Sequence, residues 1–221
     1  MRNLIICCEG ETEELFVEKI LTPYLAQLGV EVTSKGMKGV SSYKQIKGYL
    51  YGYCQSYPSA LVTTMIDYYK TSKLIVNYFK ADKTITASIN AETDIYKRAV
   101  AIEKIVEADM HPLENLMFNM ELHEFEGYLF SHTAAFADIA SKSQLDELAN
   151  IRHRHETPEH INEKYETSPS RRIIGILPKY QKLQDGIPIA ESITIDKIAA
   201  ECRHFANWLA KLTAWAKGEE Q

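Results

Sequence analysis

The stretch that decides the fold lies at the start of the chain and reads Leu4-Ile5-Ile6-Cys7-Cys8-Glu9-Gly10. Its five apolar residues follow one another without alternation, which predicts a strand at residues 3–8 with both faces buried. An acidic segment follows at once and opens a predicted helix over residues 11–28, because carboxylates suit the positive end of the helix dipole. A buried strand that leads directly into a helix is typical of a parallel α/β sheet.

The alternation of strand and helix continues through the first half of the chain. Residues 68–93 are polar and favour no particular element. The remaining pattern predicts right-handed crossovers and a parallel sheet. The expected elements are strands at 30–33, 60–67 and 115–122 and helices at 43–54 and 94–108.

The chain beyond about residue 133 has helical patterns and no convincing strand. We therefore expect an α/β core over residues 1–132 and a helical C-terminal subdomain over residues 133–221. The last helix carries an apolar stripe that predicts a core-facing side. The residues of this stripe follow one another at spacings of 4, 3, 4 and 3: Ile198, Cys202, Phe205, Leu209 and Leu212.

The composition is that of an ordinary globular protein, with 221 residues and 45% hydrophobic content. The net charge of −5 argues against a broadly basic coat for nucleic acid, although it leaves room for local basic patches. The four cysteines form no C-x-x-C pair, which predicts buried thiols and a reducing cytoplasm. No stretch approaches the roughly 20 apolar residues of a membrane span.

Carboxylates follow three of the predicted strands. Glu9 follows the first, Asp67 ends the third, and Glu121-Leu122-His123-Glu124-Phe125-Glu126 ends the fourth. Ligands bind beyond the carboxyl ends of parallel strands, and carboxylates about 4 Å apart repel one another by about 4 kcal/mol at an effective dielectric near 20. A hard divalent cation offsets such repulsion. The sequence therefore predicts a Mg²⁺ or Mn²⁺ site with ligands drawn from Glu9, Asp67, Glu124, Glu126 and Glu121. The alternative is that these residues are ordinary helix caps, turn residues and surface acids.

Two segments are candidates for holding phosphate. The first is Ser168-Pro169-Ser170-Arg171-Arg172, which offers free backbone N–H groups, a hydroxyl and two guanidinium groups at one helix start. The second is the loop 36–42 with Lys38, which lacks the G-K-[ST] of a nucleotide-binding loop. A capped, solvated helix is the alternative for the first. Tyrosines also cluster between residues 43 and 57; they could stack on bases, although core edges are the commoner cause.

The segment Glu9-Gly10-Glu11-Thr12-Glu13 resembles the first motif of the Toprim domain of topoisomerases, primases and overcoming-lysogenization-defect nucleases. In that family the corresponding Glu acts as general acid or base, and an Asp-x-Asp at a later strand end helps to bind magnesium. Asp67-Tyr68-Tyr69 matches the first half of the second motif, with Tyr69 in place of the second Asp.

The whole chain resembles a bacterial Toprim-like family called domain of unknown function 4276. This resemblance implies a Toprim-like core and, for several members, companionship with ATPases in anti-phage or DNA-processing loci. The motifs that carry it are Glu9-Gly10-x-Thr12-Glu13, Thr64-Met65-Ile66-Asp67-Tyr68-Tyr69, His123-Glu124-Phe125-Glu126, Ser168-Pro169-Ser170-Arg171-Arg172 and His204-Phe205-x-x-Trp208-Leu209.

Three alternative functions agree with these sequence features. The first is a divalent-metal-dependent nuclease or phosphoryl-transfer enzyme acting on nucleic acid in phage defence or DNA processing, with Glu9, Asp67 and Glu124 as catalytic residues. The second is a non-catalytic Toprim-like partner module of an ATPase, which Tyr69 and the acidic net charge favour. The third is a small-molecule phosphohydrolase.

Overall fold

The computed structural model describes residues 1–122, 124–161 and 167–219. The chain divides into two compact units. The first contains residues 1–14 and 29–122, and the second contains residues 15–28 and 123–221. Residues 15–28 and 123–132, which the sequence-based division placed in the α/β core, are thus grouped with the second unit.

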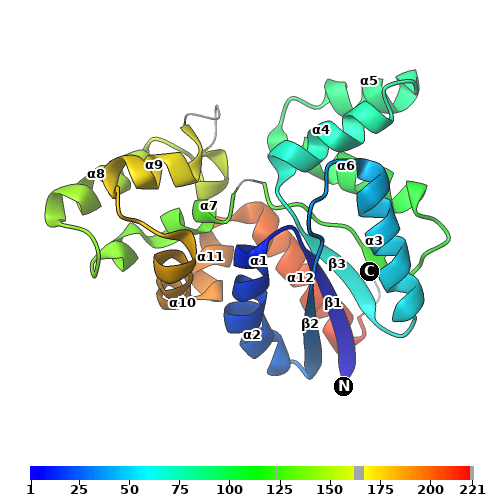
Figure 1. Cartoon of the computed structure of the whole chain (residues 1–221), viewed down its shortest axis with the longest axis horizontal. Helices are drawn as coiled ribbons and strands as arrows, with labels where there is room; N and C mark the ends of the chain where they lie inside the picture. Colours follow the sequence, from blue (N-terminus) through cyan, green and yellow to red (C-terminus); the bar gives the residue numbers. More distant parts are fainter. Residues whose placement is uncertain (123, 162–166, 220–221) are drawn as a thin grey trace. The chain divides into compact units, whose positions relative to one another are not determined.

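The first unit is built on a four-stranded sheet with the order β2-β1-β3-β4, and all of its pairings are parallel (Figure 1). The central strand is buried from Leu4 to Cys8, as expected for a run of apolar residues covered on both faces. The predicted α/β class with a helix-flanked parallel sheet is therefore confirmed. The strands are β1 (Arg2–Cys8), β2 (Val30–Gly36), β3 (Leu61–Met65) and β4 (Leu116–Met117).

Strand β4 is much shorter than the predicted strand. Beyond Met117 the backbone finds side-chain partners instead of a ladder. Phe118 N–H donates to Glu107 Oε1 at 3.0 Å, and Met120 N–H donates to Glu103 Oε1 at 2.9 Å. Because carboxylates from a neighbouring helix accept these hydrogen bonds, the buried segment needs no further strand beside it.

The helices of the first unit include two that the polar pattern of residues 68–93 did not reveal. Each begins at an aspartate N-cap. Asp67 accepts a hydrogen bond from the Lys70 N–H, and Asp82 accepts one from the Thr84 N–H, both at 2.9 Å. In Figure 1, these two helices lie on the side toward which β1 and β3 run. The helices of this unit are α3 (Tyr43–Ser56), α4 (Tyr68–Tyr78), α5 (Lys83–Ala91) and α6 (Ile95–Asp109).

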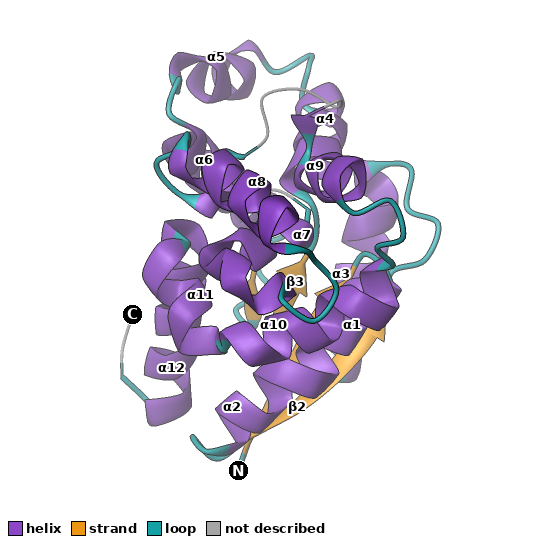
Figure 2. Cartoon of the chain, turned by 90° about the vertical axis from the view of Figure 1, so that its left-hand side faces the viewer, coloured by secondary structure: helices purple, strands orange, loops and turns teal. Residues whose placement is uncertain are grey.

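The described residues of the second unit form helices and loops but no strand (Figure 2). Its core includes the Phe16 ring, whose centroid lies 5.7 Å from that of Phe125 and 6.2 Å from that of Phe205. Its elements are the end of α1 (Glu11–Phe16), the π-helical turn η1 (Val17–Leu21), α2 (Thr22–Ala26), α7 (Glu126–Leu129), η2 (Phe130–Phe136), α8 (Lys142–His153), η3 (Pro158–His160), α9 (Pro169–Ile176), η5 (Lys182–Gly186), α10 (Ile187–Ile193), α11 (Ile195–Glu201) and α12 (Arg203–Lys217).

The predicted last helix is divided in two at Cys202, where the backbone is extended. The buried carboxylate of Glu159 accepts hydrogen bonds from the N–H groups of His204 and Phe205 at 3.0 Å and so caps α12. The five residues of the predicted stripe are all buried, which confirms the core-facing side. Among the described residues, no helix combines the length and apolar character that crossing a bilayer requires.

Candidate functional site

Glu9 and Asp67 lie beside each other beyond the ends of the two central strands. Glu9 directly follows β1, and its N–H donates to the carbonyl of Met65, the last residue of β3, at 3.2 Å. The N–H of Asp67 donates in turn to Oε2 of Glu9 at 3.2 Å. The predicted convergence of these two residues at one edge of the parallel sheet is therefore present in the first unit.

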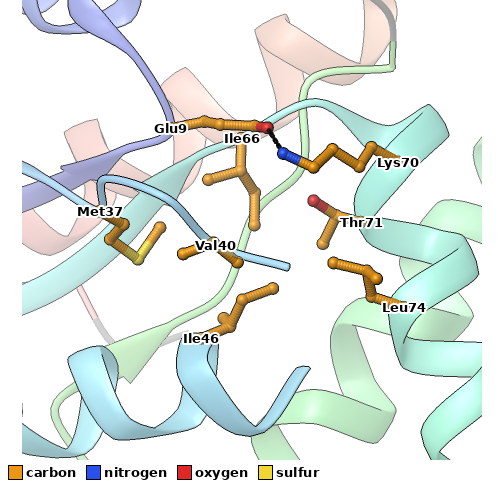
Figure 3. Close-up of a pocket in the computed structure, with 8 residues that line it drawn as sticks. All are labelled: Glu9, Met37, Val40, Ile46, Ile66, Lys70, Thr71 and Leu74. Atoms are coloured by element: carbon orange, nitrogen blue, oxygen red, sulfur yellow. Dashed lines mark hydrogen bonds and ion pairs between the residues drawn. The ribbon is translucent and has the colours of Figure 1, made fainter. Parts of the chain in front are cut away.

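Lys70 supplies a positive charge at this edge. Its N–H is bound by the Asp67 side chain, because Asp67 is the N-cap of α4. Its ammonium nitrogen lies 2.7 Å from Oε1 of Glu9, as Figure 3 shows. The side chain of Glu9 is 24% exposed and that of Lys70 is 51% exposed, so the pair stands at the surface. Lys70 is not among the residues predicted from the sequence, although it stands three residues after Asp67.

Glu121 is tied to the same edge through its backbone. The N–H of Tyr68 donates to the Glu121 carbonyl, and the N–H of Glu121 donates to the Ile66 carbonyl, both at 2.8 Å. The Glu121 side chain is buried. Burial raises the pKa of the Cys8 thiol, and the negative charge of Glu121 is among the smaller causes that raise it further. The end of β1 therefore lies in a field of negative charge.

A small pocket adjoins the Glu9–Lys70 pair. Its free volume is about 10 Å³, close to what one water molecule needs. Figure 3 shows apolar side chains around it, with the Glu9 carboxylate and the Lys70 ammonium together on one side. The residues that line it are Glu9, Met37, Val40, Ile46, Ile66, Lys70, Thr71 and Leu74. A pocket of this size holds water but cannot enclose a nucleotide or a sugar phosphate.

Tyr69 is the residue that the resemblance to the Toprim motif sets against a second aspartate. It lies in the first turn of α4 and is 43% exposed. The Lys73 ammonium lies 3.6 Å from the centroid of its ring, within the range of a cation–π contact. This position therefore supplies an aromatic face and a lysine instead of a carboxylate.

In the second unit, the Glu124 carboxylate occupies the start of α9. Its Oε2 accepts a hydrogen bond from the Ser170 N–H at 3.0 Å. Arg172 Nε donates to the Thr167 carbonyl at 2.7 Å, and Arg171 is exposed. A residue predicted as a metal ligand and a residue predicted to hold phosphate thus bind each other. The anion at this helix start is a side chain of the protein itself.

Glu126 is a buried carboxylate in the second unit, only 1% exposed. Its Oε2 lies 3.3 Å from the ammonium nitrogen of Lys182. Burial raises the pKa of Glu126, the Lys182 charge opposes this, and the Glu124 charge adds to it. Tyr180 lies close enough for the Glu126 charge to contribute to its own raised pKa, for which burial is the main cause.

The candidate residues are therefore distributed over both units. The first unit holds Glu9, Asp67, Glu121 and Lys38, and the second holds Glu124, Glu126, Ser170, Arg171 and Arg172. His123, part of the third acidic segment, lies outside the described residues. In the part of the chain that the structure describes, no three His, Cys, Asp or Glu side chains are arranged to hold a metal ion.

The comparison with protein families gives a match to Domain of unknown function (DUF4276) over residues 8–213. Since this match spans nearly the whole sequence, the chain belongs to that family. No curated protein and no solved structure matches the chain.

Proposed function

We propose that this member of the DUF4276 family is a Mg²⁺- or Mn²⁺-dependent phosphoryl-transfer enzyme that acts on nucleic acid, with its centre at Glu9 and Asp67. The observation that carries the proposal is the hydrogen bond from the Asp67 backbone N–H to the Glu9 carboxylate, which joins the residues that follow two adjacent parallel strands at one edge of the sheet. Ligand sites in α/β proteins lie at this edge. Glu124 and Glu126 belong to the second unit and are not part of the proposed centre.

The donor set suits magnesium better than metals that need a full cage of side chains. Mg²⁺ keeps several waters and is commonly bound through one or two carboxylates together with substrate phosphates. Zinc and calcium sites take more ligands from the protein. Glu9 and Asp67 offer two hard oxygen donors, and the Lys70 ammonium at 2.7 Å marks Glu9 Oε1 as an atom that attracts a cation.

Each residue has a distinct part in the proposed reaction. Glu9 and Asp67 would hold the ion, which supplies charge neutralisation at the phosphate and activation of water. Glu9 is also the proposed proton acceptor, since its carboxylate is partly accessible at the surface. Lys70 would turn its ammonium from Glu9 to a non-bridging phosphate oxygen. Glu121 keeps the Asp67 backbone in position through its two main-chain hydrogen bonds.

The small pocket beside Glu9 favours a polymeric substrate over a small phosphate ester. Sites for small molecules usually enclose roughly 300–1,000 Å³, whereas this one has about 10 Å³. A nucleic-acid strand can lie across an open edge and bring one phosphate to the carboxylates. The same proposal includes a role in DNA processing or phage defence. It also includes a cytoplasmic location, which the four buried free thiols support.

A second candidate function is a non-catalytic module that pairs with an ATPase. The Lys70–Glu9 ion pair favours it, because a permanent ammonium at this position takes over the role of a divalent ion. The variant Lys70→Gln separates the two functions. In the enzyme, removal of a competing cation raises the affinity for Mg²⁺. In the module, Mg²⁺ binds neither the parent protein nor the variant.

The proposal is tested by calorimetric titration with MgCl₂ and MnCl₂ and by cleavage of end-labelled DNA and RNA. The expected result is metal binding and metal-dependent cleavage by the parent protein, with both lost in Glu9→Gln. The matched control is Glu31→Gln, which removes one exposed carboxylate near the other end of the sheet, in β2. A parent protein that neither binds the ions nor cleaves any substrate would overturn the proposal, as would a control that loses as much as Glu9→Gln.

A further inference from the structure

The charge of the chain is distributed very unevenly. Between residues 35 and 80 there are seven lysines and a single acidic residue, Asp67, although the whole chain has a net charge of −5. This segment contains the end of β2, the loop after it, α3, β3 and the whole of α4. Its lysines are Lys35, Lys38, Lys44, Lys47, Lys70, Lys73 and Lys80. Two of them are paired with carboxylates, Lys47 with Asp109 and Lys70 with Glu9. The remaining concentration of positive charge on an acidic protein indicates a surface for a polyanion.

Aromatic rings are interleaved with these lysines along one flank of α3. The rings of Tyr49 and Tyr53 stack with their centroids 6.3 Å apart and an interplanar angle of 23°. The Lys35 ammonium lies 5.7 Å from the centroid of the Tyr57 ring. Tyr49 and Tyr57 are each 37% exposed, so their rings are open to solvent instead of serving the core.

Hydrogen bonds fix two of these rings against the end of β2. The Tyr49 hydroxyl donates to the Lys38 carbonyl at 3.4 Å, and the Tyr53 hydroxyl donates to the Gly36 carbonyl at 3.5 Å. Gly36 pairs with Cys8, the residue before Glu9. These contacts place the rings of Tyr49 and Tyr53 beside the end of β2 and the loop that follows it.

A second aromatic–lysine pair lies in α4. It consists of the exposed Tyr69 ring and the Lys73 ammonium above it. The loop after β2 and the start of α4 come together at the small pocket, where Met37 and Val40 line the same space as Glu9 and Lys70 (Figure 3). The start of α4 and the loop after β2, to which the Tyr49 hydroxyl is bound, therefore meet beside the Glu9–Lys70 pair.

We propose that these residues form a binding track for single-stranded nucleic acid, which we call the tyrosine–lysine track: Lys35, Lys38, Tyr49, Tyr57, Tyr69 and Lys73. Tyrosine faces stack on exposed bases, and lysines neutralise the backbone between them. A duplex hides its base faces, so the rings select a single strand. The position of one phosphate at Glu9 and Asp67 rests on the proposed function, but binding by the track does not.

The test is equilibrium binding in EDTA, followed by the fluorescence anisotropy of labelled oligothymidylate and oligouridylate of about 20 nucleotides. We expect Tyr49→Leu/Tyr57→Leu to weaken binding about fivefold or more, the equivalent of one lost stacked base. Tyr49→Phe/Tyr57→Phe should bind like the parent protein, because the rings remain. Lys35→Gln/Lys38→Gln should flatten the log–log salt slope by about 0.7 for each lost phosphate contact.

Two controls complete the test. Lys142→Gln removes an exposed lysine of α8 in the second unit and should leave the affinity unchanged. A duplex of the same length should bind more weakly than the single strand, and its affinity should not respond to the tyrosine changes. The inference is overturned if the Leu variant binds as tightly as the Phe variant while both melt like the parent, or if the parent binds no single strand. Track-dependent binding without metal-dependent cleavage would leave the inference standing and overturn the proposed function.

Discussion

At the scale of single residues, Asp67 combines two roles, the N-cap of α4 and a negative charge beside Glu9. The two are separable because asparagine caps a helix as well as aspartate does. We expect Asp67→Asn to keep the free energy of unfolding within about 0.5 kcal/mol of the parent, and Asp67→Ala to lose about 1 kcal/mol. Both variants should lose affinity for Mg²⁺. Urea unfolding and calorimetry measure the two effects, and an Asn variant as unstable as the Ala variant would show that the charge itself is structural.

Glu126 gives a pH dependence whose sign follows from its raised pKa. The carboxyl group of Glu126 ionises less readily in the folded than in the unfolded protein. It therefore lowers the free energy of unfolding as the pH rises above the pKa of the unfolded state, which is 4.5. Below that pH the reduction disappears. Glu126→Gln removes the buried charge, and Lys182, 38% exposed, can remain hydrated. We expect the variant to melt above the parent at pH 7 and the difference to shrink toward pH 4.5. A variant that melts well below the parent at pH 7 would mean that the ion pair outweighs the cost of burial.

At the scale of elements, α9 begins at an acceptor supplied from 46 residues away, the Glu124 carboxylate. Its own N-cap residue, Ser168, makes no side-chain capping bond. We expect Glu124→Ala to destabilise the second unit by about 1 kcal/mol, whereas Glu124→Gln retains an acceptor and loses less. Chemical denaturation measures both. Equal losses in the two variants would mean that the hydrogen bond contributes nothing and that the charge alone matters.

The elements also show what sequence patterns can reveal. The apolar run of β1 and the stripe of α12 depend on local periodicity, and both were predictable from residues near one another in the chain. Helices α4 and α5 were missed because the polar segment obscured their weaker periodicity, although Asp67 and Asp82 stood visibly at their starts. The length of β4 was not predictable, since the ladder with β3 stops where the Asn119 N–H donates to the Thr64 hydroxyl and not to a backbone carbonyl.

The candidate site also has contacts that could be predicted from the sequence and contacts that could not. The meeting of Glu9 and Asp67 was predictable, because parallel strands bring their carboxyl ends to one edge. The contact between Glu124 and Ser170 was not, because it joins two segments of an irregular helical region. Lys70 was not predicted for a different reason. The repulsion between carboxylates indicates a cation near Glu9, which we expected to be a metal ion, whereas an ammonium group of the chain itself lies there.

At the scale of the whole molecule, the second unit takes its first segment from residues 15–28. Phe16 lies in that segment and packs against Phe125 and Phe205. A fragment of residues 1–132, the core expected from the sequence, therefore keeps Phe125 beside Phe16 but lacks Phe205 and the rest of the second unit. We expect this fragment to melt without cooperativity and to bind an apolar dye. The full chain should melt cooperatively and should not bind the dye. A sharp, reversible melting transition of the fragment would show that the first unit folds alone despite this exposed segment.

The same connectivity sets an order of events during translation. Residues 15–28 leave the ribosome before residues 29–122, and that stretch must be synthesised before the partners of residues 15–28 appear. At roughly 5–20 residues per second, that stretch takes about 5–20 s. During this interval the first unit can assemble its sheet, while the Phe16 helix has no core to enter. The second unit thus contains a segment that is made well before the rest of it, and it closes only after the first unit has been synthesised. During that interval the apolar side of the early segment stays exposed to solvent or to whatever shields nascent chains.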